Sequence, residues 1–386
     1  MEHFSLEFDT VEKGMIRRAA AARRPINGTL ELTPLCNMNC GMCYIRLSRE
    51  EMERQGRLRT AQEWIQLAKQ MEQAGVLYLL LTGGEPLLFP DFQALYLRLK
   101  EMGMILTVNT NGTLINEEWA KFFGAHKPRR VNITLYGADD GAYETLCHYP
   151  GGFSKTVEAI GLLKEQGVAV KINGSVTREN RDDMEAIYRL GRELDAPVHM
   201  DTYMLPGLRQ RHLPCEKQSR LSPEDAAQAE LESHGAEMDS SSFMAYVEWK
   251  REELKRQEEL ARRMEDAGQR ETEPVKTPYS NGFFCQAGSC SFAVNWQGFL
   301  RPCVTMEEPS IPVFETGFDA AWRQLTKEVS AITFCGGCAV CSLRPVCKIC
   351  AASARLETGA YDGVPEYLCR YAQAYRQLLF RDDEVG

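Results

Sequence analysis

The amino-acid sequence predicts an α/β fold built on a parallel sheet, and three observations lead to that prediction. Short β-rich runs alternate with longer runs of helical periodicity between residues 28 and 205. The alternation gives six βα units, too few for a closed eight-stranded barrel. The chain has 386 residues, 44% of them hydrophobic, which is ample for a large core. A partial barrel and an open doubly wound sheet both fit, and both place the chemistry beyond the carboxyl ends of the strands.

Each predicted strand is short and ends in turn-forming residues. The six strands cover residues 29–33, 76–82, 104–110, 130–137, 168–174 and 196–204. Helix-like runs follow the strands, most clearly at 60–75, 154–167 and 180–194. The first of these helices places Trp64, Ile65, Ala68 and Met71 on one face and ends at a glycine.

Changes in composition divide the chain into four predicted parts. These are an N-terminal segment (1–27), the partial-barrel region (28–220), a charged helical bridge (221–279) and a cysteine-rich domain (280–386). The bridge opens with Ser222 and Pro223 in cap and first-turn positions, and its charged run indicates a solvated helix, with a partner surface as the alternative. The last part contains few long periodic segments, so we expect clustered thiolates around metal to hold it together.

Charge and the N-terminal sequence restrict the partners and the compartment. The net charge of -9 argues against a broad nucleic-acid footprint. The N-terminal residues include early acidic positions and no unbroken apolar segment, so we expect neither a secretory signal nor a membrane partner. We therefore expect a cytoplasmic protein, in which the 14 cysteines favour metal or cluster ligation over disulfides.

Three cysteines stand together directly after the first predicted strand. Cys36, Cys40 and Cys43 have the spacing Cys-x3-Cys-x2-Cys. A structural zinc site requires four protein ligands, and no nearby histidine completes one here. An iron–sulfur cluster held by three thiolates keeps one iron open for another ligand. The plain alternative, three packing cysteines, does not account for this spacing in a loop.

This motif, with Tyr44 directly after the third thiol, resembles the signature of the radical S-adenosylmethionine (radical SAM) enzymes. The sequence TGGEP at 82–86 follows the second strand and resembles the GGE motif of the same family. The resemblance implies a partial (βα)6 barrel in which backbone at Gly83 and Gly84, together with Glu85, faces the amino group of the methionine moiety. Glycine suits such positions because it lets backbone approach a ligand closely.

Two further matches to the family lie at later strands. Asn109 ends the third strand, and Thr134 occupies the position of a family serine, so the resemblance places Thr134 near the ribose or carboxylate of the cofactor. A threonine at a strand end is also explained by β-propensity alone. Lys171 and Asn173 on the fifth strand are further candidates, of which we expect one to face the barrel lumen and the other the helices.

The chemistry implied by the resemblance is reductive cleavage of S-adenosylmethionine. The three cysteines would hold a [4Fe-4S] cluster, and a flavodoxin- or ferredoxin-type donor would supply the electron. Cleavage gives methionine and a 5′-deoxyadenosyl radical, which abstracts a hydrogen atom from the substrate. In this scheme the cofactor carries the difficult step, while the protein supplies orientation and a water-poor chamber.

The C-terminal cysteines resemble the SPASM extension of radical SAM enzymes, which houses two auxiliary [4Fe-4S] clusters. The pattern runs Cys285-x12-Gly298-x4-Cys303 and then Cys338-x2-Cys341-x5-Cys347-x2-Cys350, and ends at Cys369. The family usually has three residues, not two, before the cysteine equivalent to Cys350. The resemblance assigns the first auxiliary cluster to Cys285, Cys290, Cys303 and Cys350 and the second to Cys338, Cys341, Cys347 and Cys369. Cys335 is spare, and a zinc-ribbon-like module is the alternative for the region.

SPASM-bearing enzymes mostly modify peptides or proteins, so the resemblance implies a ribosomally made precursor peptide as substrate. The expected product is a thioether or a carbon–carbon cross-link. In the sulfatase-maturing branch an Asp thought to act as base follows the cysteine equivalent to Cys303, but Val304 stands here and cannot accept a proton. Formylglycine formation therefore ranks second, and oxidation or epimerisation of a small molecule is a third class. Few residues precede the first strand, so leader recognition would use the chain's own surfaces or a separate leader-binding protein.

Overall fold

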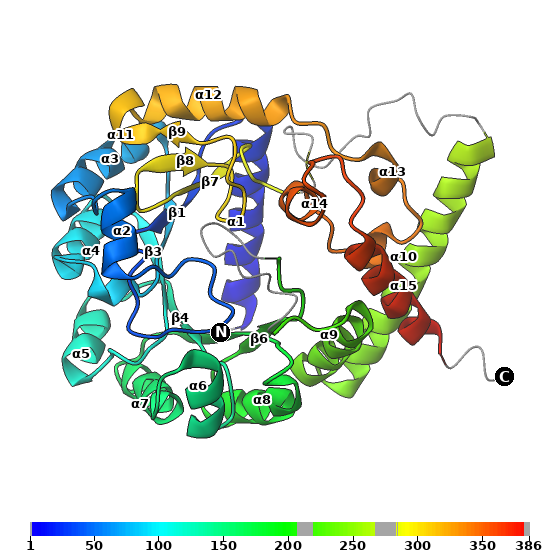
Figure 1. Cartoon of the computed structure of the whole chain (residues 1–386), viewed down its shortest axis with the longest axis horizontal. Coiled ribbons are helices and arrows are strands. Elements are labelled where there is room, and N and C mark those ends of the chain that lie inside the picture. The colour runs from blue at the N-terminus through cyan, green and yellow to red at the C-terminus, as the bar shows by residue number, and fades with distance from the viewer. Residues whose placement is uncertain (1, 207–218, 267–282, 284, 382–386) are drawn as a thin grey trace.

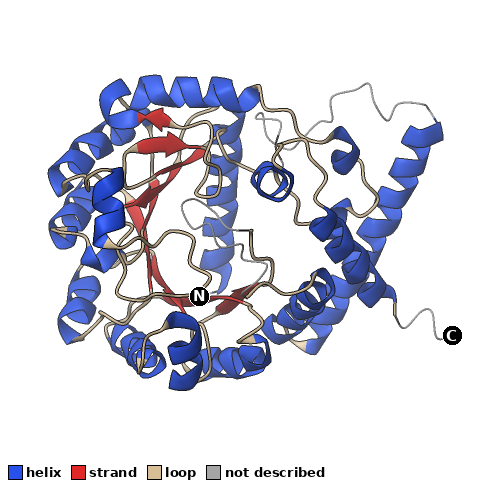
Figure 2. Ribbon diagram, in the orientation of Figure 1, coloured by secondary structure: helices blue, strands red, loops and turns tan. Residues whose placement is uncertain are grey.

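The computed structural model describes residues 2–206, 219–266, 283 and 285–381. Its strands form one curved sheet of nine strands with helices on the outer face (Figures 1 and 2). The strands are β1 (Asn27–Glu31), β2 (Tyr78–Thr82), β3 (Ile105–Thr110), β4 (Arg130–Thr134), β5 (Val170–Ser175), β6 (Val198–Asp201), β7 (Ser291–Val294), β8 (Phe299–Arg301) and β9 (Ile311–Pro312). The first six lie at the six predicted positions, within a few residues of the expected bounds, so the predicted α/β class is confirmed.

The helices vary in length from single turns of four residues to one helix of 27 residues. They are α1 (Glu2–Ala21), α2 (Arg49–Gln55), α3 (Ala61–Ala74), α4 (Phe92–Glu101), α5 (Glu117–Ala125), α6 (Asp140–Cys147), α7 (Gly152–Glu165), α8 (Met184–Glu193), α9 (Pro223–Glu237), α10 (Ser240–Asp266), α11 (Val313–Thr316), α12 (Phe318–Ser330), α13 (Gly336–Ala339), α14 (Ala351–Thr358) and α15 (Glu366–Phe380), with three-ten turns at Pro86–Leu88, Arg181–Asp183 and Arg344–Val346.

The sheet order explains why the functional site lies at one edge. The strands run β6-β5-β4-β3-β2-β1-β7-β8-β9, and every pair from β6 to β7 is parallel. The β7–β8 and β8–β9 pairs are antiparallel. Because the parallel strands share one direction, the segments that follow β1 to β6 meet at the same edge of the sheet.

Helix α3 illustrates how the local sequence sets these elements. Thr60 caps its N-terminus in a capping box with Glu63, and Gly75 ends it in the left-handed conformation at φ 93°. The four residues predicted for its apolar face, Trp64, Ile65, Ala68 and Met71, are all buried. They belong to the main hydrophobic core, which lies between the sheet and its outer helices.

The N-terminal segment forms helix α1, which the sequence analysis did not predict. Ala20 packs with Ile26 and Tyr78 near the start of β1 and β2. Glu12 accepts two hydrogen bonds from the Arg129 guanidinium, at 2.6 and 2.8 Å, just before β4. Helix α1 therefore lies at the amino-terminal end of the strands, opposite the site.

The expectation that residues 280–386 lack long periodic segments is wrong. Helix α12 buries Phe318, Ala321, Trp322, Leu325 and Val329, which follow helical spacing, and α15 buries a similar stripe. Strand β7 also pairs with β1, so the barrel sheet continues past the predicted boundary at 280. The bridge is helical as expected, with α9 and α10 beside α15 (Figure 1). The boundary at 279/280 lies outside the described residues.

Candidate active site

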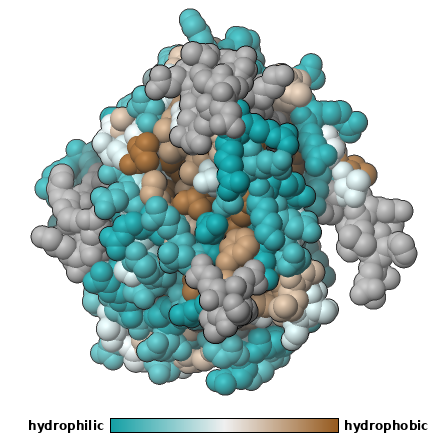
Figure 3. Space-filling view, turned by 90° about the vertical axis from the view of Figure 1, so that its right-hand side faces the viewer, coloured by the Kyte–Doolittle hydropathy of each residue, from teal (hydrophilic) through white to brown (hydrophobic). Residues whose placement is uncertain are grey.

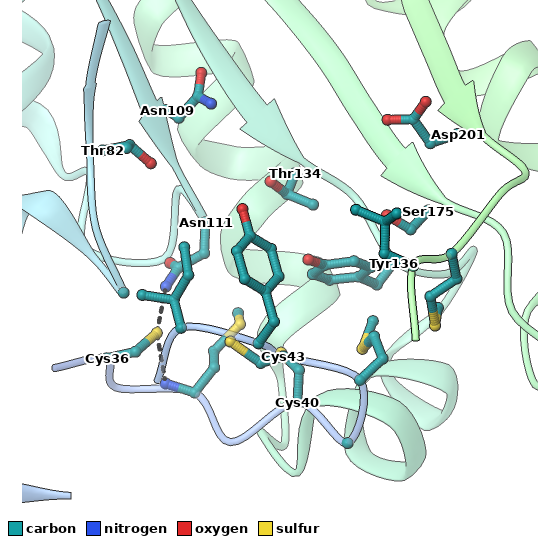
Figure 4. Close-up of a pocket in the computed structure, with 18 of the residues that line it drawn as sticks. Cys36, Cys40, Cys43, Thr82, Asn109, Asn111, Thr134, Tyr136, Ser175 and Asp201 are labelled. Atoms are coloured by element: carbon teal, nitrogen blue, oxygen red, sulfur yellow. Dashed lines mark hydrogen bonds between the residues drawn. The ribbon is translucent and has the colours of Figure 1, made fainter. Parts of the chain in front are cut away.

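The loop after β1 carries the three N-terminal cysteines into a cavity at the carboxyl edge of the sheet (Figure 4). The loop is anchored by backbone hydrogen bonds to the end of α6. Asn39 N–H donates to Cys147 O at 3.1 Å, and Gly41 N–H donates to Leu146 O at 3.0 Å. The cysteines therefore stand on a loop whose course is fixed by the fold.

The cavity has a volume of about 410 Å³ and receives side chains from the ends of most parallel strands. Its wall brings together most of the predicted site residues: Cys36, Cys40, Cys43, Tyr44, Gly83, Gly84, Asn109 and Thr134. Methionines and other apolar residues of the cysteine loop and of the segment after β6 complete it. Figure 3 shows apolar surface gathered within a largely hydrophilic face of the molecule.

Amide groups point toward the thiols of the first cluster. Met38 N–H donates to Cys36 Sγ at 3.4 Å, and Arg46 N–H donates to Cys43 Sγ at 3.4 Å. Burial raises the pKa of the Cys36 thiol to about 12. The thiolate form thus requires a positive charge nearby, such as a metal centre. Three thiols on one loop, two of them with backbone N–H donors directed at sulfur, fit an iron–sulfur cluster in their chemistry.

The two glycines of the GGE motif allow close backbone contact. In the structure this contact is with the loop that carries the cysteines. A Cβ atom added to Gly83 would lie 2.5 Å from Thr33 O, and one added to Gly84 would lie 2.4 Å from Leu35 O. Gly84 N–H donates to Thr33 O at 2.6 Å, and Glu85 N–H donates to Leu35 O at 2.8 Å. The glycines therefore hold the turn after β2 against the loop that carries the cysteines, in addition to lining the cavity.

Glu85 is fully buried and is bonded within the protein. Its carboxylate accepts hydrogen bonds from Thr110 Oγ1 at 2.8 Å and from the backbone N–H groups of Asn111 (2.9 Å) and Leu87 (3.0 Å). Burial raises its pKa to about 7, against the lowering effect of these donors. Glu85 therefore ties the turn after β2 to the turn after β3, while its predicted contact with the methionine amino group stays a prediction.

Asn109 and Thr134 line the cavity from β3 and β4. Asn109 Oδ1 accepts a hydrogen bond from Asn132 Nδ2 at 2.7 Å, which fixes its amide. The expectation for Lys171 and Asn173 is wrong in one respect. Both alternate with buried residues of β5, so their side chains share one face of the sheet instead of pointing to opposite faces.

The cavity also contains residues that the sequence analysis did not single out. Asn111 donates to Cys36 Sγ at 3.6 Å, and Tyr136, Ser175, Asp201 and Tyr203 project from the ends of β4, β5 and β6. Their signal in the sequence is only position, since each lies at or just after a predicted strand end. Among the described residues that line the cavity, Asp201 is the one member of the Asp, Glu, Lys, Arg and His types.

The C-terminal cysteines form two neighbourhoods in the described part of the chain. Although Cys285 as a whole residue is exposed, the protein atoms around its thiol displace water and raise its pKa to about 11, and negative charge on Cys303, Cys350 and Cys290 adds to this. Burial likewise raises the pKa of Cys338, with added effects from Cys335, Cys347 and Cys369. A small cavity of about 170 Å³ lies between the two groups and is lined by Cys285, Cys347 and Cys350.

Two cysteines need separate comment. Cys290 has no exposed surface and packs against Ala20, Ile26 and Tyr78. Cys335, predicted as spare, accepts a hydrogen bond at Sγ from Cys338 N–H at 3.3 Å. Among the described residues, no three His, Cys, Asp or Glu side chains are gathered as ligands of a single ion. The assignment of auxiliary ligands stays a prediction, and Cys215 lies outside the described residues.

The family comparison supports the interpretation of Cys36, Cys40 and Cys43 as a radical SAM motif. The model of the radical SAM superfamily matches residues 30–191, which span β1 to most of α8 and include all three thiols of the loop. The chain contains a radical SAM domain. The cavity lies at the carboxyl edge of the strands of this domain. Radical SAM proteins bind a [4Fe-4S] cluster and S-adenosylmethionine.

Curated relatives of the radical SAM domain have different activities. An AdoMet-dependent heme synthase of Nitratidesulfovibrio vulgaris is 26% identical and aligns over 88% of this chain and 91% of its own length. The PqqA peptide cyclase of Granulibacter bethesdensis is 26% identical over 45% of each chain. The subtilosin biosynthesis protein AlbA of Bacillus subtilis is 27% identical over 45% of this chain and 38% of its own.

Solved structures share the fold over nearly the whole chain. SuiB of Streptococcus suis bound to S-adenosylmethionine has a TM-score of 0.61 at 15% identity, covering 96% of this chain and 81% of its own. The enzyme anSMEcpe with bound AdoMet has a TM-score of 0.61 at 19% identity, covering 92% and 96%. Within the described residues, no helix is both long and apolar enough to cross a membrane.

Proposed function

We propose that this protein cleaves S-adenosylmethionine reductively and uses the resulting radical to modify a ribosomally synthesised peptide. The product would be a thioether or a carbon–carbon cross-link. Two auxiliary [4Fe-4S] clusters in the C-terminal domain, a flavodoxin- or ferredoxin-type donor and a separate leader-binding protein belong to the same proposal. The bound cluster would supply the electron that breaks the sulfonium bond. The residues of the chain would bind and orient the cofactor and the substrate and shield the radical from water.

The residues of the cavity divide this work. Cys36, Cys40 and Cys43 would hold the cluster, while the turns at Gly83 and Asn109 would hold the cofactor. Apolar side chains such as Met42 and Leu205 line the same space and keep water away from the reacting atoms. No side-chain acid or base is needed for the cleavage itself.

The observation that carries the peptide proposal is the charge of the cavity. The described residues of its wall include no lysine or arginine, and Asp201 is the acidic side chain among them. A tetrapyrrole with several carboxylates would need cations to neutralise it, because burying an unpaired carboxylate is costly. A peptide backbone with neutral or cationic side chains meets no such penalty.

The second candidate function is a heme-synthase-like reaction on a porphyrin. It is favoured by the heme synthases of Nitratidesulfovibrio vulgaris and Methanosarcina barkeri, which align over 88% and 86% of this chain at 26% and 24% identity. The peptide-modifying curated relatives named above align over 45% of the chain. Formylglycine formation is disfavoured because Val304 cannot act as the base expected after Cys303.

An anaerobic assay with parallel substrates tests the proposal. The reconstituted full chain would be incubated with S-adenosylmethionine and dithionite, together with short peptides encoded beside its gene, iron-coproporphyrin III or a sulfatase-derived cysteine peptide. Loss of a hydrogen pair from an encoded peptide, detected by mass spectrometry, would support peptide modification. A change in the mass of the porphyrin with unchanged peptides would replace the proposal by the second candidate.

A further inference from the structure

Two neighbouring residues at the exit of β6 join the active-site cavity to the C-terminal domain. Tyr203 lines the cavity, and its hydroxyl reaches α14. Thr202 is 1% exposed and contacts the loop between Cys347 and Cys350 through Lys348. Consecutive residues of an extended segment point to opposite sides, so this short segment makes two separate attachments.

The first attachment centres on Glu357 near the end of α14. Tyr203 Oη donates a hydrogen bond to Glu357 Oε1 at 2.8 Å. The same carboxylate forms an ion pair with Arg220, and the two side chains are only 8% and 2% exposed. Arg220 comes from the segment before α9, so three parts of the chain meet at one buried carboxylate.

Aromatic rings fix the position of the Arg220 guanidinium. Its central carbon lies 3.5 Å from the ring centroid of Tyr367 and 5.3 Å from that of Tyr203. Tyr367 Oη donates to Leu221 O at 3.0 Å, so Tyr367 also contacts the residue directly after Arg220. A guanidinium held by a carboxylate and by ring faces has little freedom to move.

The second attachment centres on Glu230 of α9. Thr202 Oγ1 donates to Glu230 Oε2 at 2.6 Å, and Lys348 Nζ donates to the same oxygen at 2.6 Å. Lys348 also lies 3.3 Å from Thr202 Oγ1, which closes a triangle of polar contacts. The loop between two predicted cluster ligands is thus held to the end of the last barrel strand.

Neither attachment is needed merely to hold the cysteine-rich region against the rest of the chain, because other contacts do this. Arg370 of α15 pairs with Glu224 of α9 at 3.0 Å, and both side chains are about half exposed. That pair links α15 to α9 without touching the cavity. The attachments at Thr202 and Tyr203 differ because they are buried and because one of them ends in the cavity wall.

We propose that Tyr203, Glu357 and Arg220, together with Thr202, Glu230 and Lys348, form an exit clamp that positions the cavity wall against the cysteine-rich domain during the reaction. The inference rests on the proposed function and extends it. A fixed Tyr203 keeps the substrate within reach of the radical, because small displacements of reacting atoms are costly in rate. When Tyr203 is not held in place, we expect more S-adenosylmethionine to be cleaved for each molecule of product formed.

The decisive variant is Tyr203→Phe, which removes the hydroxyl and keeps the ring. We expect the ratio of 5′-deoxyadenosine to modified product to rise roughly tenfold. Arg370→Met is the control, since it breaks an ion pair between α15 and α9 that lies away from the cavity, and it should leave the ratio unchanged. A ratio in Tyr203→Phe equal to that of the wild type would overturn the inference.

A second measurement needs no substrate. Hydrogen exchange of the full chain should become faster in Tyr203→Phe at both 198–205 and 350–358, while α4 keeps its protection. If the wild type modifies none of the tested substrates but this joint change occurs, the proposed function fails and the clamp stands. If exchange rises at 198–205 alone, the clamp does not connect the two parts and the inference fails.

Charge variants separate positioning from mere stability. Glu357→Gln leaves the buried Arg220 charge without its carboxylate, so the variant should unfold at lower denaturant. The double variant Arg220→Met with Glu357→Met removes both charges and should recover much of the stability. It still lacks the acceptor for Tyr203 and should remain uncoupled. Recovery of wild-type coupling by the double variant would contradict a positioning role for the Tyr203 hydrogen bond.

Discussion

The side-chain amide of Asn111 donates a hydrogen bond to Sγ of Cys36 at 3.6 Å. The same nitrogen donates to Asn37 Oδ1 at 2.9 Å, and Asn111 Oδ1 accepts from Thr113 N–H at 2.9 Å. The turn after β3 is thereby fixed to the first cysteine of the loop (Figure 4). Hydrogen bonds to cluster sulfurs help to set reduction potential, so this contact has a measurable consequence.

Replacing Asn111 by Ala should make the proposed cluster harder to reduce. Loss of one hydrogen bond worth about 0.5–1.5 kcal/mol corresponds to a fall of roughly 20–60 mV in midpoint potential for a one-electron couple. Anaerobic titration followed by electron paramagnetic resonance would measure it. Asn116→Ala, which removes a helix cap at α5 instead, is the control and should leave the potential unchanged. Equal potentials in both variants would show that the Asn111 contact does not tune the cluster.

Replacing Cys36, Cys40 and Cys43 together by Ala should abolish formation of 5′-deoxyadenosine, because no thiolate ligand remains for the cluster. Chromatography of anaerobic reactions with dithionite measures this product. Cys147→Ala is the matched control, since Cys147 is buried beside the loop but lies outside the cavity. Cys369→Ala should retain some cofactor cleavage. Continued cleavage by the triple variant would remove the basis of the proposal.

Gly84→Ala should destabilise the protein because its Cβ would lie 2.4 Å from Leu35 O. Overpacking of this kind costs about 1–3 kcal/mol, or more where backbone must shift. Gly161→Ala is the control, since a Cβ at that position of α7 has nothing within 4 Å and alanine favours the helix by about 0.8–1 kcal/mol. Urea unfolding of both variants would compare the two free energies. A Gly84→Ala variant as stable as Gly161→Ala would contradict the close contact of the two turns.

Much of the fold was predictable because its signals are local. The apolar face of α3, for example, follows from the spacing of Trp64, Ile65, Ala68 and Met71 and from the glycine stop. Helix α12 has equally regular apolar spacing. Its region is rich in cysteines, which favoured a prediction of metal-bound loops over one of helices. The pairing of β7 with β1 was not predictable, since it joins residues more than 260 positions apart and depends on tertiary structure.

The site was predictable where a spacing identifies it and not where only topology does. Cys36, Cys40 and Cys43 form a motif that stands out along the chain. Asp201 and Tyr203 enter the same cavity only because β6 is parallel to its neighbours. Glu85 was predictable as a residue of the GGE motif, but its contacts were not. Its burial and its hydrogen bond from Thr110 depend on tertiary structure, and they determine what its carboxylate does.

His199 on β6 should make stability depend on pH. Its ring lies 3.7 Å from an oxygen of Asp201 and 3.5 Å from one of Glu237, and these contacts raise its pKa to about 9 against burial and the nearby charge of Lys171. An imidazole whose folded pKa is raised stabilises the protein fully below its ordinary value of 6.5. This contribution is lost as the pH rises through 9.

The difference in unfolding free energy between wild type and His199→Gln should therefore shrink as the pH rises. Because the side chain is about half exposed, screening limits the contribution to roughly 1 kcal/mol or less. Urea unfolding at about pH 6 and about pH 9.5 measures it, and comparing the two proteins cancels the titration of the cysteines. A difference that stays constant across this interval would mean that His199 carries no charge stabilised by Asp201 and Glu237.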